Sequence, residues 1–328
     1  MRRLILFCLL LLAPLRALEY YGLHLERYDY PFEVKRFYID LQHQTLGMAY
    51  MDLQPEKPNG KTILLLHGKN FTGAYWETTA RHLSSRGYRV VMPDQIGFGK
   101  SSKPEHLQYS FQMLARNTAQ LMDHLGIKTH YLLGHSMGGM IATRYALMFP
   151  ERVEKLILEN PIGLEDWQRF LPNPSFDTWY KAELGKSAEG IYRYQLESYY
   201  DGKWQKKYRP WVDILASFTA SKEEYPKIAF IQALVSEMIF SQPVCYQFDQ
   251  LKMPVLLIIG QRDKTALGKN LVSPEVRAKM GDYPRLGRET AKKIPNATLL
   301  ELDGIGHMPH IEAFDSFLHG VLKFIGGA

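Results

Sequence analysis

Short apolar runs of strand-forming residues alternate with segments of helical periodicity along most of this chain. The run at 61–66 ends in four consecutive apolar residues, as expected for a strand buried on both faces. Alternation of this kind predicts an α/β fold with a mostly parallel central sheet and helices on both faces. The predicted strands are 32–41, 45–54, 61–66, 88–92, 131–134, 155–159, 255–259 and 298–302, and the predicted helices are 75–86, 111–125, 137–149, 284–293 and 311–324.

The alternation stops between residues 161 and 250, after the sixth predicted strand, and resumes at 255. This stretch is rich in aromatic residues, with 18 in 90 positions, or 20 %, against 12 % for the whole chain. One sheet interrupted in this way predicts an insertion rather than a second tandem domain. We therefore expect a core domain formed by residues 18–160 and 251–328, with a helical lid at 161–250.

The N-terminus has the order of a secretory signal peptide. A basic start with Arg2 and Arg3 precedes an apolar run over 4–12, and the small residue Ala17 follows. The run is too short for a membrane-spanning helix, so residues 1–17 predict a cleaved leader, a secreted or periplasmic protein and no stable membrane span after cleavage. Cleavage would lower the formal charge from +6 to +3. No Lys/Arg-rich run remains, so we expect no nucleic-acid partner.

The sequence Gly134-His135-Ser136-Met137-Gly138 lies between a predicted strand and a predicted helix. A serine at this position sits on a tight, strained turn that exposes its hydroxyl at the carboxyl end of the strand. Glycines on both sides keep neighbouring side chains out of that turn. We therefore predict Ser136 as a nucleophile.

A serine hydroxyl needs an adjacent base, and the base needs a carboxylate that orients it. Asp263 follows the predicted strand 255–259, and His307 follows the predicted strand 298–302. The carboxyl ends of parallel strands meet at one edge of a sheet, so both residues should lie near Ser136. His307 is the predicted base and Asp263 the predicted acid.

Two nearby residues compete for these roles. His310 should fall at the start of the last helix, where a packing or surface role is expected, and Asp303 could cap a turn. The pair His307 and His310 has no evident third ligand, so no metal site is predicted.

The oxyanion of an acyl-transfer reaction needs backbone N–H donors. The N–H of Met137, directly after Ser136, is one predicted donor, and the N–H of Lys69, in the loop after the third strand, is the other. His67 in the same loop is expected to hold the loop by hydrogen bonds rather than to act as a base.

These motifs resemble the α/β-hydrolase superfamily, in particular its lidded branch with a serine nucleophile, over about residues 45–325. The resemblance rests on His67-Gly68, the loop from Pro93 to Ser101, Gly134-His135-Ser136-Met137-Gly138-Gly139, Gly260-Gln261-Arg262-Asp263 and Gly306-His307. Related haloalkane dehalogenases and epoxide hydrolases carry an aspartate where this chain has Ser136, so those activities are disfavoured. The resemblance implies a cofactor-independent hydrolase that cleaves a small or medium, partly apolar ester, lactone or thioester through an acyl-enzyme.

The sequence leaves alternatives open. C–C bond hydrolysis and peroxyacid formation use the same serine chemistry, and a catalytically silent binding protein could share the fold. The partner expected in every case is a small molecule, and the oligomeric state is not predicted. The aromatic residues of 161–250 could line a substrate pocket, or they could form the small core of the lid and dock it on the main domain.

Overall fold

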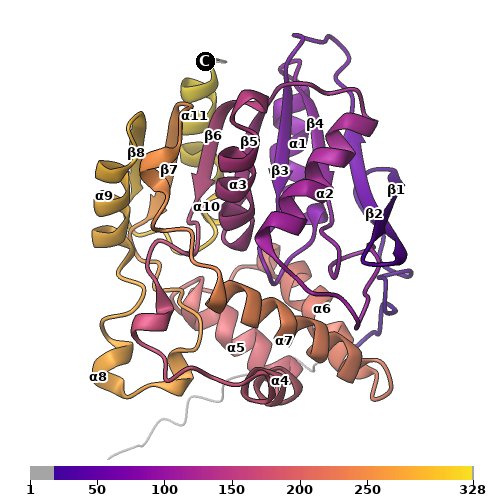
Figure 1. The fold of residues 1–328 in the computed structure, drawn as a ribbon, viewed down its shortest axis with the longest axis vertical. Coiled ribbons are helices and arrows are strands. Elements are labelled where there is room, and N and C mark those ends of the chain that lie inside the picture. Colours follow the sequence, from indigo (N-terminus) through magenta and orange to yellow (C-terminus); the bar gives the residue numbers. More distant parts are fainter. Residues whose placement is uncertain (1–17, 327–328) are drawn as a thin grey trace, which may run out of the picture.

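An eight-stranded sheet runs through the middle of the molecule in the order β1-β2-β4-β3-β5-β6-β7-β8 (Figure 1). Strand β2 pairs antiparallel with β1 and β4, and all the other neighbouring pairs are parallel. The strands are β1 (Val34–Leu41), β2 (Gln44–Leu53), β3 (Thr62–Leu66), β4 (Arg89–Pro93), β5 (His130–His135), β6 (Val153–Glu159), β7 (Val255–Gly260) and β8 (Ala297–Leu302). The predicted α/β fold class is confirmed.

The computed structural model describes residues 18–326 of the 328-residue chain. The predicted leader, residues 1–17, lies outside this range. No helix within 18–326 combines the length and apolar character that crossing a bilayer requires.

Helices connect the strands, and four of the five helices predicted with bounds match the structure within two residues at each end. They are α1 (Glu77–Ser84), α2 (Phe111–His124), α3 (Met137–Met148), α4 (Phe176–Leu184), α5 (Ala188–Ser198), α6 (Arg209–Ser217), α7 (Tyr225–Ser241), α8 (Pro274–Arg277), α9 (Tyr283–Lys293), α10 (Pro309–Glu312) and α11 (Phe314–Ile325). Helix α2 shows why: the Ser110 hydroxyl accepts from the N–H of Met113 as an N-cap, and Gly126 follows the helix with φ 69°.

One predicted helix differs from the structure. The segment predicted as a single helix over 311–324 is split into α10 and α11, because Ala313 has non-helical backbone angles, φ −132° and ψ 54°. The Glu312 side chain accepts from the N–H of Gly306 at 3.0 Å, which ties α10 to the loop after β8. Helix α11 instead packs against the sheet through residues such as Phe317 and Val321.

Two apolar layers cover the sheet, and the period of two along a strand divides the side chains between them. Leu64 and Leu66 of β3 belong to the layer that contains α2, α3 and α9. Ile63 and Leu65 belong to the opposite layer, which contains α1 and α11. The central strands are therefore buried on both faces.

The chain between β6 and β7 forms the helices α4 to α7, and we call residues 161–250 the insertion. These helices gather beyond one end of the sheet (Figure 1). Leu25, from the segment before β1, packs with Ile214 of α6 and Ile228 of α7. The segment before β1 therefore packs against helices of the insertion.

Candidate active site

Ser136 occupies the turn between β5 and α3 in a strained conformation. Its backbone angles are φ 56° and ψ −121°, a region that residues with a side chain rarely adopt. The Ser136 N–H donates to the carbonyl of Glu159 at 3.2 Å, which fixes the turn against the end of β6. The side chain is 7 % exposed.

Three glycines make room for this turn. A Cβ on Gly134 would lie 2.2 Å from the carbonyl oxygen of Gly138, and a Cβ on Gly138 would lie 2.3 Å from the carbonyl oxygen of Leu66. A Cβ on Gly68 would lie 3.0 Å from Cβ of Ser136. The loop after β3 therefore packs directly on Ser136, and side chains at 134 or 138 would push the elements apart.

The structure brings the three residues predicted for catalysis together. His307 Nε2 lies 3.0 Å from Ser136 Oγ, and His307 Nδ1 lies 2.6 Å from Asp263 Oδ2. Because an ionised carboxylate only accepts, Nδ1 carries the proton and Nε2 is left to accept from the Ser136 hydroxyl. His307 and Asp263 are buried, at 1 % and 0 % exposure. The arrangement is suited to removing a proton from Ser136.

Asp263 accepts three hydrogen bonds. Besides His307 Nδ1, the Asn160 amide donates to Oδ2 at 2.7 Å, and the N–H of Thr265 donates to Oδ1 at 2.8 Å. Burial acts to raise the pKa of the Asp263 carboxyl, but the adjacent His307 ring and these hydrogen bonds hold the pKa below its ordinary value. Asp263 is therefore ionised beside His307.

Asn160 was not among the predicted site residues. It follows β6 directly, and its side-chain oxygen also accepts from the N–H of Gly260 at 2.9 Å. One amide thus joins the end of β6 to the end of β7 and to Asp263. Its position just after a strand at the same edge as Ser136 was the only available signal.

His135, next to Ser136, belongs to a second buried chain of hydrogen bonds. The N–H of Gly68 donates to the Tyr75 hydroxyl at 3.1 Å, and that hydroxyl donates to His135 Nδ1 at 3.0 Å. His135 Nε2 then donates to the carbonyl of His307 at 2.7 Å. Burial keeps the pKa of His135 well below its ordinary value, so the ring is neutral and can both accept and donate. Sequence patterns gave no signal for Tyr75.

The competing residues have other partners. His310 is buried, and its N–H and Nδ1 both donate to Glu159 Oε1 at 2.8 Å. Burial lowers the pKa of His310 and raises that of Glu159 to about 7. Asp303 is exposed, and no hydrogen bond to His307 is present within residues 18–326.

The predicted oxyanion donors belong to the two segments that meet at Ser136. The N–H of Met137 is at the start of α3, and the N–H of Lys69 follows Gly68, which contacts Ser136. Neither N–H has a hydrogen-bond partner among the described residues. His67 holds this loop: its Nε2 accepts from the N–H of Gln95 at 3.0 Å, and its Nδ1 donates to the carbonyl of Gly68 at 2.9 Å.

The insertion covers this site through Tyr199, at the end of α5. Its ring stacks on His307 with centroids 4.9 Å apart and planes at 27°. The Asn70 amide donates to the Tyr199 hydroxyl at 3.0 Å. By contrast, Tyr200 and Tyr208 stack on each other at 3.6 Å and pack in the apolar layer that contains α1 and α11. Tyr199 therefore lies at the catalytic residues, whereas Tyr200 and Tyr208 dock the insertion on the core domain.

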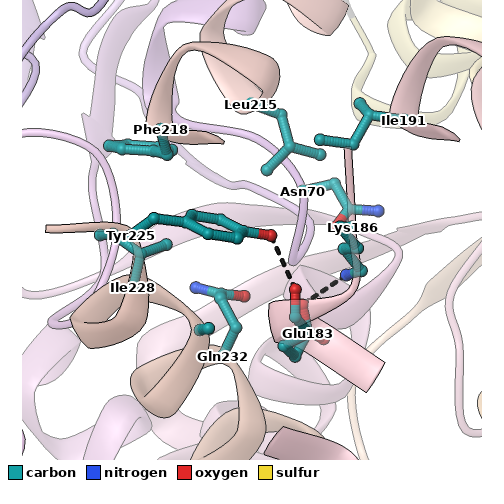
Figure 2. Close-up of a pocket in the computed structure, with 10 residues that line it drawn as sticks. Asn70, Glu183, Lys186, Ile191, Leu215, Phe218, Tyr225, Ile228 and Gln232 are labelled. Carbon is teal, nitrogen blue, oxygen red and sulfur yellow. Dashed lines mark hydrogen bonds and ion pairs between the residues drawn. The ribbon is translucent and has the colours of Figure 1, made fainter. Parts of the chain in front are cut away.

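Two small cavities adjoin the loop after β3, and neither is lined by Ser136. Figure 2 shows the first, where Asn70 faces side chains from α4, α6 and α7. Apolar residues shared by both cavities are Leu215, Phe218 and Ile228. Within residues 18–326, no group of three or more His, Cys, Asp or Glu residues is placed to hold a metal ion.

Comparison with known proteins identifies the family. A family model described as alpha/beta hydrolase fold matches residues 61–194. A crystal structure of a probable hydrolytic enzyme from Pseudomonas aeruginosa is 48 % identical, covers 94 % of this chain and 99 % of that chain, and has a TM-score of 0.92. This chain belongs to the α/β-hydrolase superfamily.

Other members of the superfamily are more distant. Lipase 1 of Psychrobacter immobilis is 27 % identical over 84 % of this chain and 81 % of that protein. The 2-hydroxy-6-oxo-6-phenylhexa-2,4-dienoate hydrolase of Comamonas testosteroni is 36 % identical, over 36 % of this chain and 42 % of that protein. The chain is therefore an α/β-fold hydrolase, and its relatives act on different substrates.

The double role of Asn160 can be tested by unfolding. Asn160→Ala leaves the N–H of Gly260 without its acceptor and removes one donor from Asp263, both in buried surroundings. We expect the free energy of unfolding to fall by about 1–3 kcal/mol, measured by urea denaturation. Asn296→Ala is the control, because Asn296 is exposed and only its backbone carbonyl bonds to Val255. Equal stability of the two variants would contradict the role of Asn160.

Proposed function

We propose that this α/β-hydrolase is a serine hydrolase that cleaves small or medium, partly apolar esters, lactones or thioesters. The observation that carries the proposal is the buried chain of contacts from Ser136 through His307 to Asp263, at 3.0 and 2.6 Å. Residues in this geometry activate a serine hydroxyl for attack on an acyl carbon. A serine at this position also argues against the carboxylate chemistry of dehalogenases.

In this mechanism, the Ser136 oxygen attacks the substrate carbonyl while His307 Nε2 takes the hydroxyl proton. The ionised Asp263 stabilises the positive charge that forms on His307. The N–H groups of Met137 and Lys69 stabilise the negative oxygen of the tetrahedral intermediate. His307 then gives its proton to the leaving alcohol or thiol, which leaves an acyl group on Ser136. Water, activated by His307, releases the acid.

The insertion acts in this proposal as a lid that shapes the substrate site. Support comes from the Tyr199 ring on His307 and from the 7 % exposure of Ser136. A covered site with an aromatic ring beside the base favours substrates with an apolar part over fully hydrated ones.

A fluorophosphonate probe and a panel of aryl esters test this function. Native protein should form one covalent phosphonyl adduct, with loss of fluoride, on the peptide that contains Ser136. It should also hydrolyse aryl esters of graded acyl length. Ser136→Ala and heat-unfolded protein should do neither, because only the folded site activates the hydroxyl. Absence of both probe labelling and ester hydrolysis in the native protein would favour a silent binding protein. Labelling with turnover of a 1,3-diketone, whose C–C cleavage releases an enolate, but of no ester would favour C–C hydrolysis.

We also propose that residues 1–17 direct the protein out of the cytoplasm and are removed. The basic start, the apolar run and Ala17 support this proposal. N-terminal sequencing of protein from its native host should give a chain that begins at Leu18. A chain that keeps Met1 and is recovered from the cytoplasm would contradict it.

A further inference from the structure

The insertion holds the loop after β3 by two consecutive residues. The Lys69 ammonium lies 2.7 Å from Glu183 Oε1 of α4, and the Asn70 amide donates to Tyr199 at the end of α5. The Lys69 and Glu183 side chains are only 13 % and 10 % exposed, so solvent screens their attraction weakly. The insertion therefore holds the side chain of Lys69, whose backbone N–H is one of the proposed oxyanion donors.

Glu183 is itself firmly held within the insertion. Lys186 lies 2.5 Å from its other carboxylate oxygen, and the Tyr225 hydroxyl of α7 donates to its backbone carbonyl at 2.7 Å (Figure 2). Burial acts to raise the pKa of Glu183, but Lys69 and Lys186 lower it to about 2. The carboxylate is thus charged, and the Tyr225 contact fixes the backbone that carries it.

The core domain holds the loop after β3 at Gly68, the residue before Lys69. The N–H of Gly68 donates to the Tyr75 hydroxyl, and the carbonyl of Gly68 accepts from His67 and from the N–H of Phe71. The Gly68 carbonyl and the Lys69 N–H belong to one peptide, so these hydrogen bonds hold one end of that peptide, and its other end depends on where the Cα atom of Lys69 is held. An oxyanion donor must point at the developing charge from 2.7–3.1 Å, where a shift of about 1 Å costs on the order of 100-fold in rate.

We propose that the Lys69 side chain and Glu183 form a positioning pair for the oxyanion site. The pair holds the Cα end of the Lys69 peptide, so that the direction of its N–H depends on α4 docked on the core as well as on the hydrogen bonds to the Gly68 carbonyl. The proposal rests on the proposed function, because it assumes that an oxyanion forms beside Ser136. It assigns to the insertion a part in building the site as well as covering it.

Two matched substitutions test the pair. Lys69→Met keeps the backbone N–H and most of the side-chain volume but removes the link to α4. Lys186→Met removes the same charge from the same carboxylate without touching the loop. We expect Lys69→Met to lower kcat for an aryl ester about 10- to 100-fold with KM changed less than about threefold. Lys186→Met should keep kcat within about threefold of the native value.

Binding of a transition-state analogue separates positioning from stability. A trifluoromethyl ketone forms a tetrahedral adduct with an oxyanion, so Lys69→Met should weaken its inhibition by the same factor as kcat/KM. Glu183→Gln should lose less, because the amide oxygen still accepts from Lys69, and this variant serves if Lys69→Met does not fold. Adding Glu183→Gln to Lys69→Met should cause no further loss, because both act through one contact.

The outcomes that overturn the proposal differ from those that overturn the function. Equal losses of kcat in Lys69→Met and Lys186→Met, or a change confined to KM or to thermal stability, would show that the pair only holds the insertion. Full activity of Lys69→Met would show that the Lys69 side chain does not position the oxyanion donor. Absence of Ser136-dependent turnover in the native protein would instead overturn the proposed function, and this inference with it.

Discussion

The strained turn at Ser136 is the constraint on which the rest of the site depends. Its positive φ exposes the hydroxyl at the end of β5, and this conformation persists only because the surroundings hold it. Glycines at 134, 138 and 68 allow β5, α3 and the loop after β3 to meet within van der Waals distance. The parallel order of β5, β6 and β7, with β8 at the edge, then brings Asp263 and His307 to the same end of the sheet.

Hydrogen bonds between buried polar groups fix the positions of the loops that meet at Ser136. Asn160 joins β6, β7 and Asp263, and the chain from Gly68 through Tyr75 and His135 reaches the backbone of His307. Each of these groups is neutral or paired, as a buried site requires. The insertion adds its own contacts, with Tyr199 on His307 and Glu183 on Lys69. The oxyanion loop is thus held from both the core and the insertion.

Local patterns predict the sheet, its covering helices and the positions of Ser136, Asp263 and His307, because each lies within five residues of the carboxyl end of a strand. They do not predict Asn160, Tyr75 or Glu183, whose contacts span 103, 60 and 114 positions of the chain and arise only in the folded molecule. The split between α10 and α11 was also missed, because the backbone angles of Ala313 oppose a continuous helical pattern. The aromatic residues of the insertion looked alike in sequence, and only packing separates Tyr199 from Tyr200 and Tyr208.

The central claim is that Ser136 and His307 perform one chemical step together, and a double-mutant cycle tests it most directly. Turnover of a short-chain aryl ester would be measured for Ser136→Ala, His307→Ala, the double variant and His310→Ala. If the two residues act as a unit, each single change should cost about 10⁶-fold in kcat, and the double variant should be no slower. His310→Ala should keep far more activity, because its ring is bonded to Glu159. Losses that multiply in the double variant, or a severe loss in His310→Ala with His307→Ala nearly active, would contradict the account.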